Sequence, residues 1–160
     1  MSFTHLDQQG NANMVDITDK APTSRTAVAQ GYVYMLPETL KKVQQQDMAK
    51  GDVLTVARIA GIQGAKRCSD LIPLCHPLAL SKVSIDFELQ PEKNRIQIQS
   101  LCKVTGKTGV EMEALTAVSV TALTIFDMCK AIEPTMRIAD IQVLRKQGGK
   151  SGDWSVNSSA

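Results

Sequence analysis

The sequence predicts an α+β fold, and three patterns carry that prediction. Two stretches in which apolar and polar residues alternate flank a turn at residues 91–94, as in an antiparallel hairpin with one solvated face. A long apolar stretch from about Glu111 then predicts a helix. Strand-like segments stand before and after these elements, and two helix-like segments follow the first strand. The order matches a ferredoxin-like β-α-β-β-α-β sandwich with an antiparallel sheet and one extra helix.

The first half of the chain supplies a strand and two helices. Thr, Val and Tyr residues predict strands at residues 14–17 and 25–35, and Pro37 suits the first turn of a short helix through residue 46. A second helix is expected over residues 52–67, where apolar residues form one stripe and Asp52 is a plausible N-cap. Two prolines predict an ordered loop at residues 69–77.

The second half of the chain shows clearer secondary-structure patterns than the first. The hairpin strands are expected at residues 83–89 and 95–104, the long helix over residues 111–133, and a last strand at residues 138–144. A glycine-rich run at residues 148–152 opens a flexible tail. We therefore expect a single domain over residues 1–160, with flexible tails at residues 1–13 and 148–160.

Composition narrows the class of protein. The net charge of the 160 residues is +2 and only 4% of them are aromatic, which argues against a nucleic-acid or membrane surface. Residues 1–13 lack the basic and apolar regions of a signal peptide, and the uncharged stretch 114–126 is shorter than the roughly 18 residues of a membrane span. No Cys-x-x-Cys pair occurs, and only His5 and His76 could complete a metal site. We expect a cytoplasmic protein with reduced, mostly buried thiols and no metal site.

The long helix carries the most informative charges. Glu111 and Glu113 stand at one end, and Asp127 and Lys130 stand near the other on a shared face. The second pair could transfer protons at a site, or it could be a structural ion pair near the helix end. Glu113 and Asp127 are about 21 Å apart along an unbroken helix and only about 40° apart around it. If both serve one site, that site lies between two subunits.

Loops supply further candidates, each with an ordinary structural alternative. Lys50 precedes a helix N-terminus, where anions are stabilised. His76 lies in a stiff turn between two prolines, and it could equally be a structural histidine. Arg25 could clamp an anion, and Lys146 precedes the glycine run, although surface charge explains both. The Gly-Lys-Thr and Gly-Lys-Ser triplets at residues 106–108 and 149–151 lack the first glycine of a P-loop.

These same segments resemble those of the MoaC family, the cyclic pyranopterin monophosphate synthases. The resemblance rests on KGDVLTVARIAGI at residues 50–62, LIPLCHPL at 71–78, TGKTGVEMEALT at 105–116, DMCKA at 127–131 and GGKSG at 148–152. It covers residues 4–153, nearly the whole chain. Two departures, Gly64 in place of alanine and Cys68 in place of threonine, stand beside the site loop rather than in it.

The resemblance implies a lyase-type reaction in molybdenum cofactor biosynthesis. The substrate would be 3′,8-cyclo-7,8-dihydroguanosine 5′-triphosphate, and the products cyclic pyranopterin monophosphate and diphosphate. It implies a homohexamer built as a trimer of dimers, with sites at the dimer interface and no resident metal or redox cofactor. It makes Asp127 and Lys130 the acid/base pair, with Lys50 as a further catalytic residue. The implied substrate-binding residues are Arg25, Leu74, Cys75, His76, Glu111, Met112, Glu113 and Lys146.

One rival hypothesis comes from another functional class. A ferredoxin-like module could bind a phosphorylated purine metabolite and perform no chemistry. An Asp/Lys pair set into an apolar helix favours the enzyme, because a pure binding site seldom needs such a pair. Release of diphosphate from the cyclised nucleotide would discriminate between the two.

Overall fold

The computed structural model describes residues 3–48 and 50–158. In chain order its elements are β1 (Thr23–Tyr34), α1 (Pro37–Gln44), α2 (Val53–Lys66), α3 (Cys68–Leu71), β2 (Lys82–Gln90), η1 (Pro91–Lys93), β3 (Arg95–Gly106), α4 (Glu111–Cys129), β4 (Arg137–Gln147), β5 (Trp154–Ser155) and η2 (Val156–Ser158).

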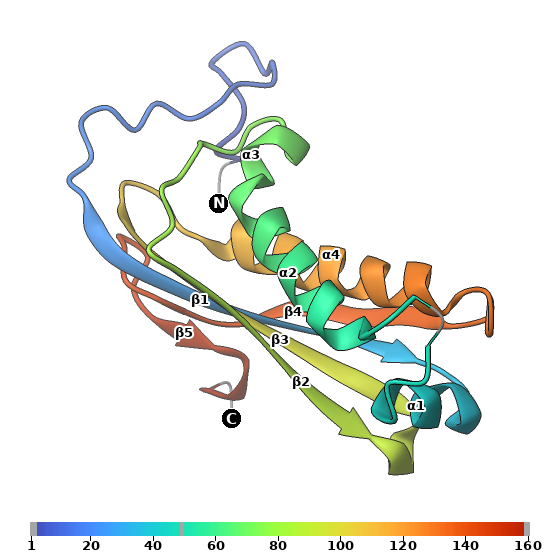
Figure 1. Ribbon diagram of the computed structural model, residues 1–160. Coiled ribbons are helices and arrows are strands. Elements are labelled where there is room, and N and C mark those ends of the chain that lie inside the picture. Colours follow the sequence, from blue (N-terminus) through green and yellow to red (C-terminus); the bar gives the residue numbers. More distant parts are fainter. Residues whose placement is uncertain (1–2, 49, 159–160) are drawn as a thin grey trace.

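The five strands form one sheet in the order β2-β3-β1-β4-β5, and every neighbouring pair is antiparallel. Strands β1 and β2 therefore run in the same direction with β3 between them, and β3 and β4 do so with β1 between them. Helices α2 and α4 lie across the same face of the sheet (Figure 1). This is the predicted ferredoxin-like α+β sandwich, with β5 added at one edge.

The hairpin prediction is confirmed in its register as well as its position. Strand β2 pairs with β3 from Lys82 opposite Lys103 to Gln90 opposite Arg95. Along β3, Ile96 and Ile98 are fully buried while their neighbours in sequence are partly exposed. A period of two residues places alternate side chains on opposite faces, so one face of the sheet joins the core and the other meets solvent.

Several predicted boundaries differ from the structure. Helix α1 ends at Gln44 and α4 at Cys129, earlier than residues 46 and 133. Residues 14–17 form no strand, and the expected loop begins with the short helix α3. Strand β5 lies within the expected C-terminal tail, while residues 1–2 and 159–160 of the two tails fall outside the described residues.

The predicted N-cap of α2 is present. The Asp52 carboxylate accepts a hydrogen bond from Thr55 N at 3.1 Å, and the Thr55 hydroxyl donates to its other oxygen. Such a cap satisfies one of the backbone donors that every helix leaves unpaired at its first turn. Asp52 therefore sets where α2 begins, directly after the segment that carries Lys50.

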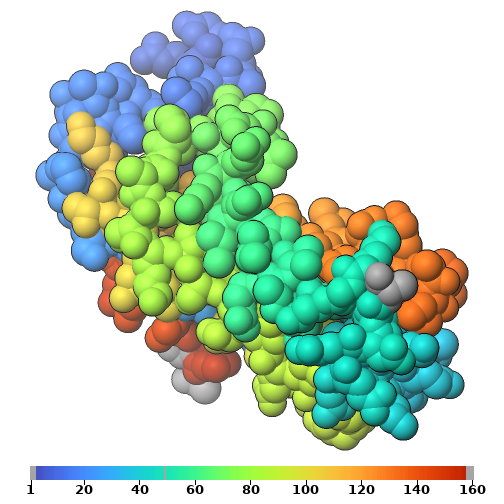
Figure 2. Space-filling model, viewed as in Figure 1, coloured from blue at the N-terminus to red at the C-terminus, as the bar shows by residue number. Residues whose placement is uncertain are grey.

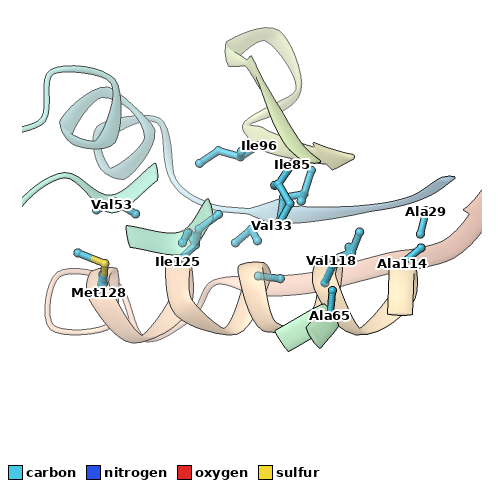
Figure 3. Packing of buried hydrophobic residues seen from close by; sticks show 14 of the residues in the cluster. Ala29, Val33, Val53, Ala65, Ile85, Ile96, Ala114, Val118, Ile125 and Met128 are labelled. Atoms are coloured by element: carbon cyan, nitrogen blue, oxygen red, sulfur yellow. The ribbon is translucent and has the colours of Figure 1, made fainter. Parts of the chain in front are cut away.

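Helix α4 is the centre of the core. Its side chains Ala114, Val118 and Ile125 are fully buried, and Figure 3 shows them facing Ala29 and Val33 of β1. Polar residues are tolerated in this helix because their hydroxyls donate to carbonyls one turn earlier, as at Ser119, Thr121 and Thr124. The helix is long and apolar enough to cross a membrane by length and composition, but more than half of its apolar window is buried, as in the core helix of a soluble protein.

Helix α2 packs on α4 through a glycine. A Cβ built on Gly61 would overlap Thr121 Oγ1 and Ile85 Cδ1 and would lie 2.9 Å from the carbonyl oxygen of Ala117. The Thr121 hydroxyl is itself bound to that carbonyl at 2.7 Å, so it cannot turn away freely. The two helices therefore touch backbone to backbone at this point.

Substitution of Gly61 by alanine tests this contact. Alanine normally stabilises a helix by about 1 kcal/mol relative to glycine, but here the added methyl group overpacks the interface. We expect Gly61→Ala to lower the free energy of unfolding by about 1–3 kcal/mol in urea titrations. The exposed Gln63→Ala on the same helix is the matched control, and equal stability of Gly61→Ala and the wild type would contradict the close packing.

Candidate active site

Three charged side chains meet at the C-terminal end of α4, and we call Lys50, Asp127 and Lys130 the Asp127 cluster. Lys130 Nζ donates to Asp127 Oδ1 at 2.7 Å, the predicted pairing three residues apart along the chain. Lys50 arrives from the segment before α2, with its Nζ 3.2 Å from the Asp127 carbonyl oxygen and 3.5 Å from Oδ2. One carboxylate therefore lies between two ammonium groups.

The Asp127 cluster is exposed in the single chain. The side-chain exposed fractions are 59% for Asp127, 54% for Lys130 and 50% for Lys50. The hydrogen bond from Lys130, its charge and that of Lys50 hold the pKa of Asp127 below its ordinary value of 3.8. The carboxylate is thus ionised at neutral pH, and the two amines beside it can donate protons or bind anions.

A second group of predicted residues surrounds a cavity of about 260 Å³ at the other end of α4, which we call the Glu113 cavity. The turn that follows α3 and the first turn of α4 provide two of its walls. All six residues predicted from those two segments line it: Leu74, Cys75, His76, Glu111, Met112 and Glu113. The structure thus brings together most of the side chains that the resemblance assigned to substrate binding.

Glu113 is buried without a full set of partners. The residue is only 4% exposed, and its Oε2 atom has no hydrogen-bond partner among the described residues. Burial, with a smaller contribution from the negative charge of Glu111, raises its pKa from 4.5 to about 7. Glu113 is therefore a carboxyl group able to change protonation state near neutral pH, on the wall of a cavity.

Glu111 and His76 are both engaged in the single chain. Lys146 Nζ lies 3.2 Å from Glu111 Oε1, and the Lys146 side chain is only 12% exposed. His76 Nε2 lies 2.7 Å from the carbonyl oxygen of Val15. A carbonyl can only accept, so the imidazole donates this hydrogen bond through Nε2. His76 therefore makes a structural hydrogen bond and also lines the cavity.

Arg25 is buried and hydrogen-bonded within the single chain. It is 5% exposed and its Nε donates to the Gly106 carbonyl at 3.3 Å. A Cβ on Gly149 would overlap the guanidinium of Arg25, and Gly149 has a φ of +83°. The positive φ favours glycine there, because other residues disfavour this backbone conformation. Arg25 is not among the residues that line the Glu113 cavity.

Nine of the eleven predicted site residues therefore fall into these two groups, and Arg25 and Lys146 lie outside both. Helix α4 is continuous from Glu111 to Cys129, so Glu113 and Asp127 lie about 21 Å apart along its axis. The Asp127 cluster does not touch the Glu113 cavity, whose lining includes none of its three residues. One small molecule cannot bridge that distance within one chain.

The thiols do not form a nucleophilic pair with histidine. Cys68, Cys102 and Cys129 are buried as expected, and burial raises the pKa of Cys68 and Cys102 to about 12. Burial also raises the pKa of Cys75, whose sulfur contacts Cys68. A thiol with a raised pKa is a poor nucleophile, so Cys75 contributes to the cavity wall by shape and backbone.

Sequence reasoning missed part of the cavity wall. Residues from the expected N-terminal tail, from the segment between that tail and β1, and from the loop before α4 also line it: Thr4, His5, Val15, Ile17, Lys20, Thr108 and Gly109. The sequence pattern points to His5 only as a possible metal ligand. Among the described residues, no group of three or more His, Cys, Asp or Glu side chains is arranged to hold a metal ion. No local pattern identifies the five residues that precede β1, since their neighbours in space are remote in the chain, whereas Thr108 and Gly109 belong to the TGKTGVEMEALT segment.

Comparison with protein families gives a match over most of the chain. A family model described as "MoaC family" matches residues 14–149. Among solved structures, the chain is similar to a crystal structure of a mutant of the ferredoxin protease FusC in complex with Arabidopsis ferredoxin. The identity there is 13% and the TM-score 0.32, over 68% of this chain and 10% of that one. The chain thus spans about a tenth of that chain's length.

The raised pKa of Glu113 predicts a pH dependence of stability. As pH rises above 4.5, this carboxyl ionises in the unfolded chain but stays protonated in the folded protein until about pH 7. The unfolded state therefore binds fewer protons across that window, and this residue's contribution to stability falls by about 3 kcal/mol as pH rises.

Urea unfolding of the wild type and of Glu113→Gln at intervals from pH 4.5 to 7.5 measures this contribution. In Glu113→Gln, the decrease in the free energy of unfolding between pH 4.5 and 7 should be absent. Glu38→Gln, at an exposed glutamate of α1, is the control and should show the same decrease as the wild type. Parallel stability curves for the wild type and Glu113→Gln would show that Glu113 ionises normally in the folded protein.

Proposed function

Because the chain belongs to the MoaC family and so has a role in molybdenum cofactor biosynthesis, we propose that it is a cyclic pyranopterin monophosphate synthase. The proposed reaction converts 3′,8-cyclo-7,8-dihydroguanosine 5′-triphosphate to cyclic pyranopterin monophosphate and diphosphate, which makes the enzyme a lyase. The observation that carries the proposal is that one family match spans both ends of α4, with the Asp127 cluster at one end and the Glu113 cavity at the other.

The Asp127 cluster suits the proton transfers of the rearrangement. Opening and reclosing the rings of the substrate requires groups that accept and donate protons in turn. Asp127 is ionised and can accept a proton, and Lys130 at 2.7 Å can return one. Lys50 adds a second cation, which stabilises negative charge that develops on phosphate oxygens as diphosphate leaves.

The Glu113 cavity suits the base of the nucleotide. A purine-derived ring presents N–H groups, and the unpartnered Oε2 of Glu113 offers an acceptor for one of them. Donation to this oxygen would favour the ionised form of Glu113 in the complex. Lys146, held near the cavity by Glu111, is placed to exchange that carboxylate for a phosphate oxygen.

We further propose that each working site combines the Asp127 cluster of one chain with the Glu113 cavity of another. The separation of about 21 Å within one chain is too long for one substrate. The cavity, at about 260 Å³, is also smaller than the roughly 300–1,000 Å³ typical of ligand pockets. The proposed assembly is a hexamer built as a trimer of dimers, and the proposed compartment is the cytoplasm. Arg25 would support the part of the site that binds phosphate, through its contact with the Gly148–Gly149 turn.

Replacement of Asp127 tests the acid/base assignment. Asp127→Asn keeps the size of the side chain but removes its ability to accept a proton at neutral pH, so we expect diphosphate release to fall by about 10²–10⁴-fold. Asp86→Asn, at an exposed position of β2, is the matched control and should leave the rate unchanged. Wild-type protein that releases no diphosphate would reject the proposed reaction, and normal turnover by Asp127→Asn would reject only the role of Asp127.

A mixing experiment tests whether the site is shared. Glu113→Gln and Asp127→Asn chains, each inactive alone, are unfolded together and refolded as mixed assemblies. In a random mixture half of the dimers are mixed, and each mixed dimer has one intact site, so about a quarter of wild-type activity should return. Two batches refolded separately and then combined are the control, and no recovery at any mixing ratio would place the site within one chain.

A further inference from the structure

The N-terminal segment is ordered against the Glu113 cavity instead of extending away as a tail. Figure 1 shows it passing along the end of the molecule beside α3, and Figure 2 shows it packed there next to the residues that follow α2. Residues from two parts of this segment line the cavity: Thr4 and His5 from one, and Val15, Ile17 and Lys20 from the other. We refer to residues 4–20 as the strap.

Internal hydrogen bonds give the first part of the strap a defined shape. Asn13 N donates to the His5 carbonyl at 2.8 Å, and Leu6 forms a bridge with Ala12. Asp7 closes the turn between them, since its Oδ1 accepts from Gln9 N at 2.9 Å and from Asn11 N at 2.8 Å. These bonds hold the backbone of His5 in place beside the cavity.

The second part of the strap is a turn that ends at Lys20. Asp16 Oδ1 accepts from the amide of Thr18 at 2.9 Å and from its hydroxyl at 2.6 Å. Lys20 N then donates to the Ile17 carbonyl at 3.1 Å. Lys20 thus stands on a hydrogen-bonded turn directly before β1 and is not part of a loose chain end.

Two long-range bonds fasten this second part to the body of the protein. The Val15 carbonyl is 2.7 Å from His76 Nε2, and the Thr18 carbonyl accepts from Lys107 Nζ at 2.8 Å. His76 and Lys107 lie on the two loops that border the cavity, after α3 and before α4. The strap is therefore held on both sides of the cavity mouth through its backbone, which leaves its side chains available to the cavity.

The charge of the cavity wall gives the strap a chemical role. Glu111 and Glu113 supply two carboxyl groups to the wall, and Lys20 is the one lysine or arginine among the described residues that line it. A triphosphate derivative carries several negative charges, so a binding site for it requires cations close to its oxygens. The strap brings a cation to the wall that otherwise bears acidic groups.

We propose that the strap is a functional wall of the substrate site, and that Lys20 and His5 on it contact the bound nucleotide through its negatively charged oxygens. This inference rests on the proposed function, because it identifies the ligand as the cyclised nucleotide triphosphate. It adds two specificity-determining side chains to that function and gives the N-terminal segment a role in binding.

The test uses the full chain in the Asp127→Asn background, so that the cyclised nucleotide binds without turnover. Loss of a charge-assisted hydrogen bond should raise the dissociation constant of Lys20→Ala about tenfold or more. Lys20→Arg should stay within about threefold because the charge is kept, and His5→Ala should weaken binding less than Lys20→Ala. Lys93→Ala, at an exposed position in η1 at the far end of the sheet, is the control for loss of net charge.

Hydrogen exchange gives an independent readout. Amides of residues 4–20 should become more protected when the cyclised nucleotide is added, and those of η1 should not change. If Lys20→Ala and His5→Ala bind the nucleotide as tightly as their parent and the strap gains no protection, this inference is wrong. Normal turnover by the wild type would in that case still support the proposed function. Wild-type protein that neither binds nor converts the nucleotide would overturn both.

Discussion

Helix α4 can lie against both the sheet and α2 only because small residues line the contact on each side. On the sheet side, Ala114 and Val118 of α4 face β1, where a Cβ on Gly31 would come within 2.7 Å of a Val118 methyl carbon. On the other side, Gly61 of α2 reaches the backbone of α4 at Ala117. Larger side chains at these positions would push the layers apart, because protein interiors have few voids to absorb extra volume. The direction of α4, and with it the position of both groups of candidate residues, follows from this packing.

The two ends of α4 offer opposite environments to carboxylates. At the N-terminal end, burial under the loop after α3 raises the pKa of Glu113 to about 7. At the C-terminal end, the hydrogen bond from Lys130 and the charges of Lys130 and Lys50 lower the pKa of Asp127. Environments that separate the pKa values of two acids allow one to act as a proton donor and the other as an acceptor at the same pH. The same helix that spaces the two groups apart also sets these environments.

Exposure of the Asp127 cluster has a consequence for an assembled enzyme. In water, an ion pair between exposed side chains contributes little to stability, because solvent screens the charges and long side chains lose freedom. Lys50, Asp127 and Lys130 therefore contribute little to holding the single chain together. Coverage by a second chain would remove solvent and strengthen each of these interactions, as well as any interaction with a bound phosphate. In the proposed assembly, the chemistry of these groups would therefore depend on the second chain as well as on folding.

The amino-acid sequence by itself determined the elements whose partners are close in the chain. Alternation of apolar residues located the β2–β3 hairpin, the Asp52 side chain marked the start of α2, and a spacing of three residues paired Asp127 with Lys130. Each of these rests on a contact within one element or across one turn. Resemblance to a family identified the candidate residues, including those that local patterns leave ambiguous.

Tertiary structure decided what depends on contacts between remote segments. Lys50 meets Asp127 across 77 positions, and His76 meets the Val15 carbonyl across 61. The second contact fastens the segment before β1. Burial by the fold raises the pKa of Glu113 and leaves Arg25 only 5% exposed. Local preference cannot report such features, because the free energy that orders these groups comes from neighbours that only the folded chain brings together.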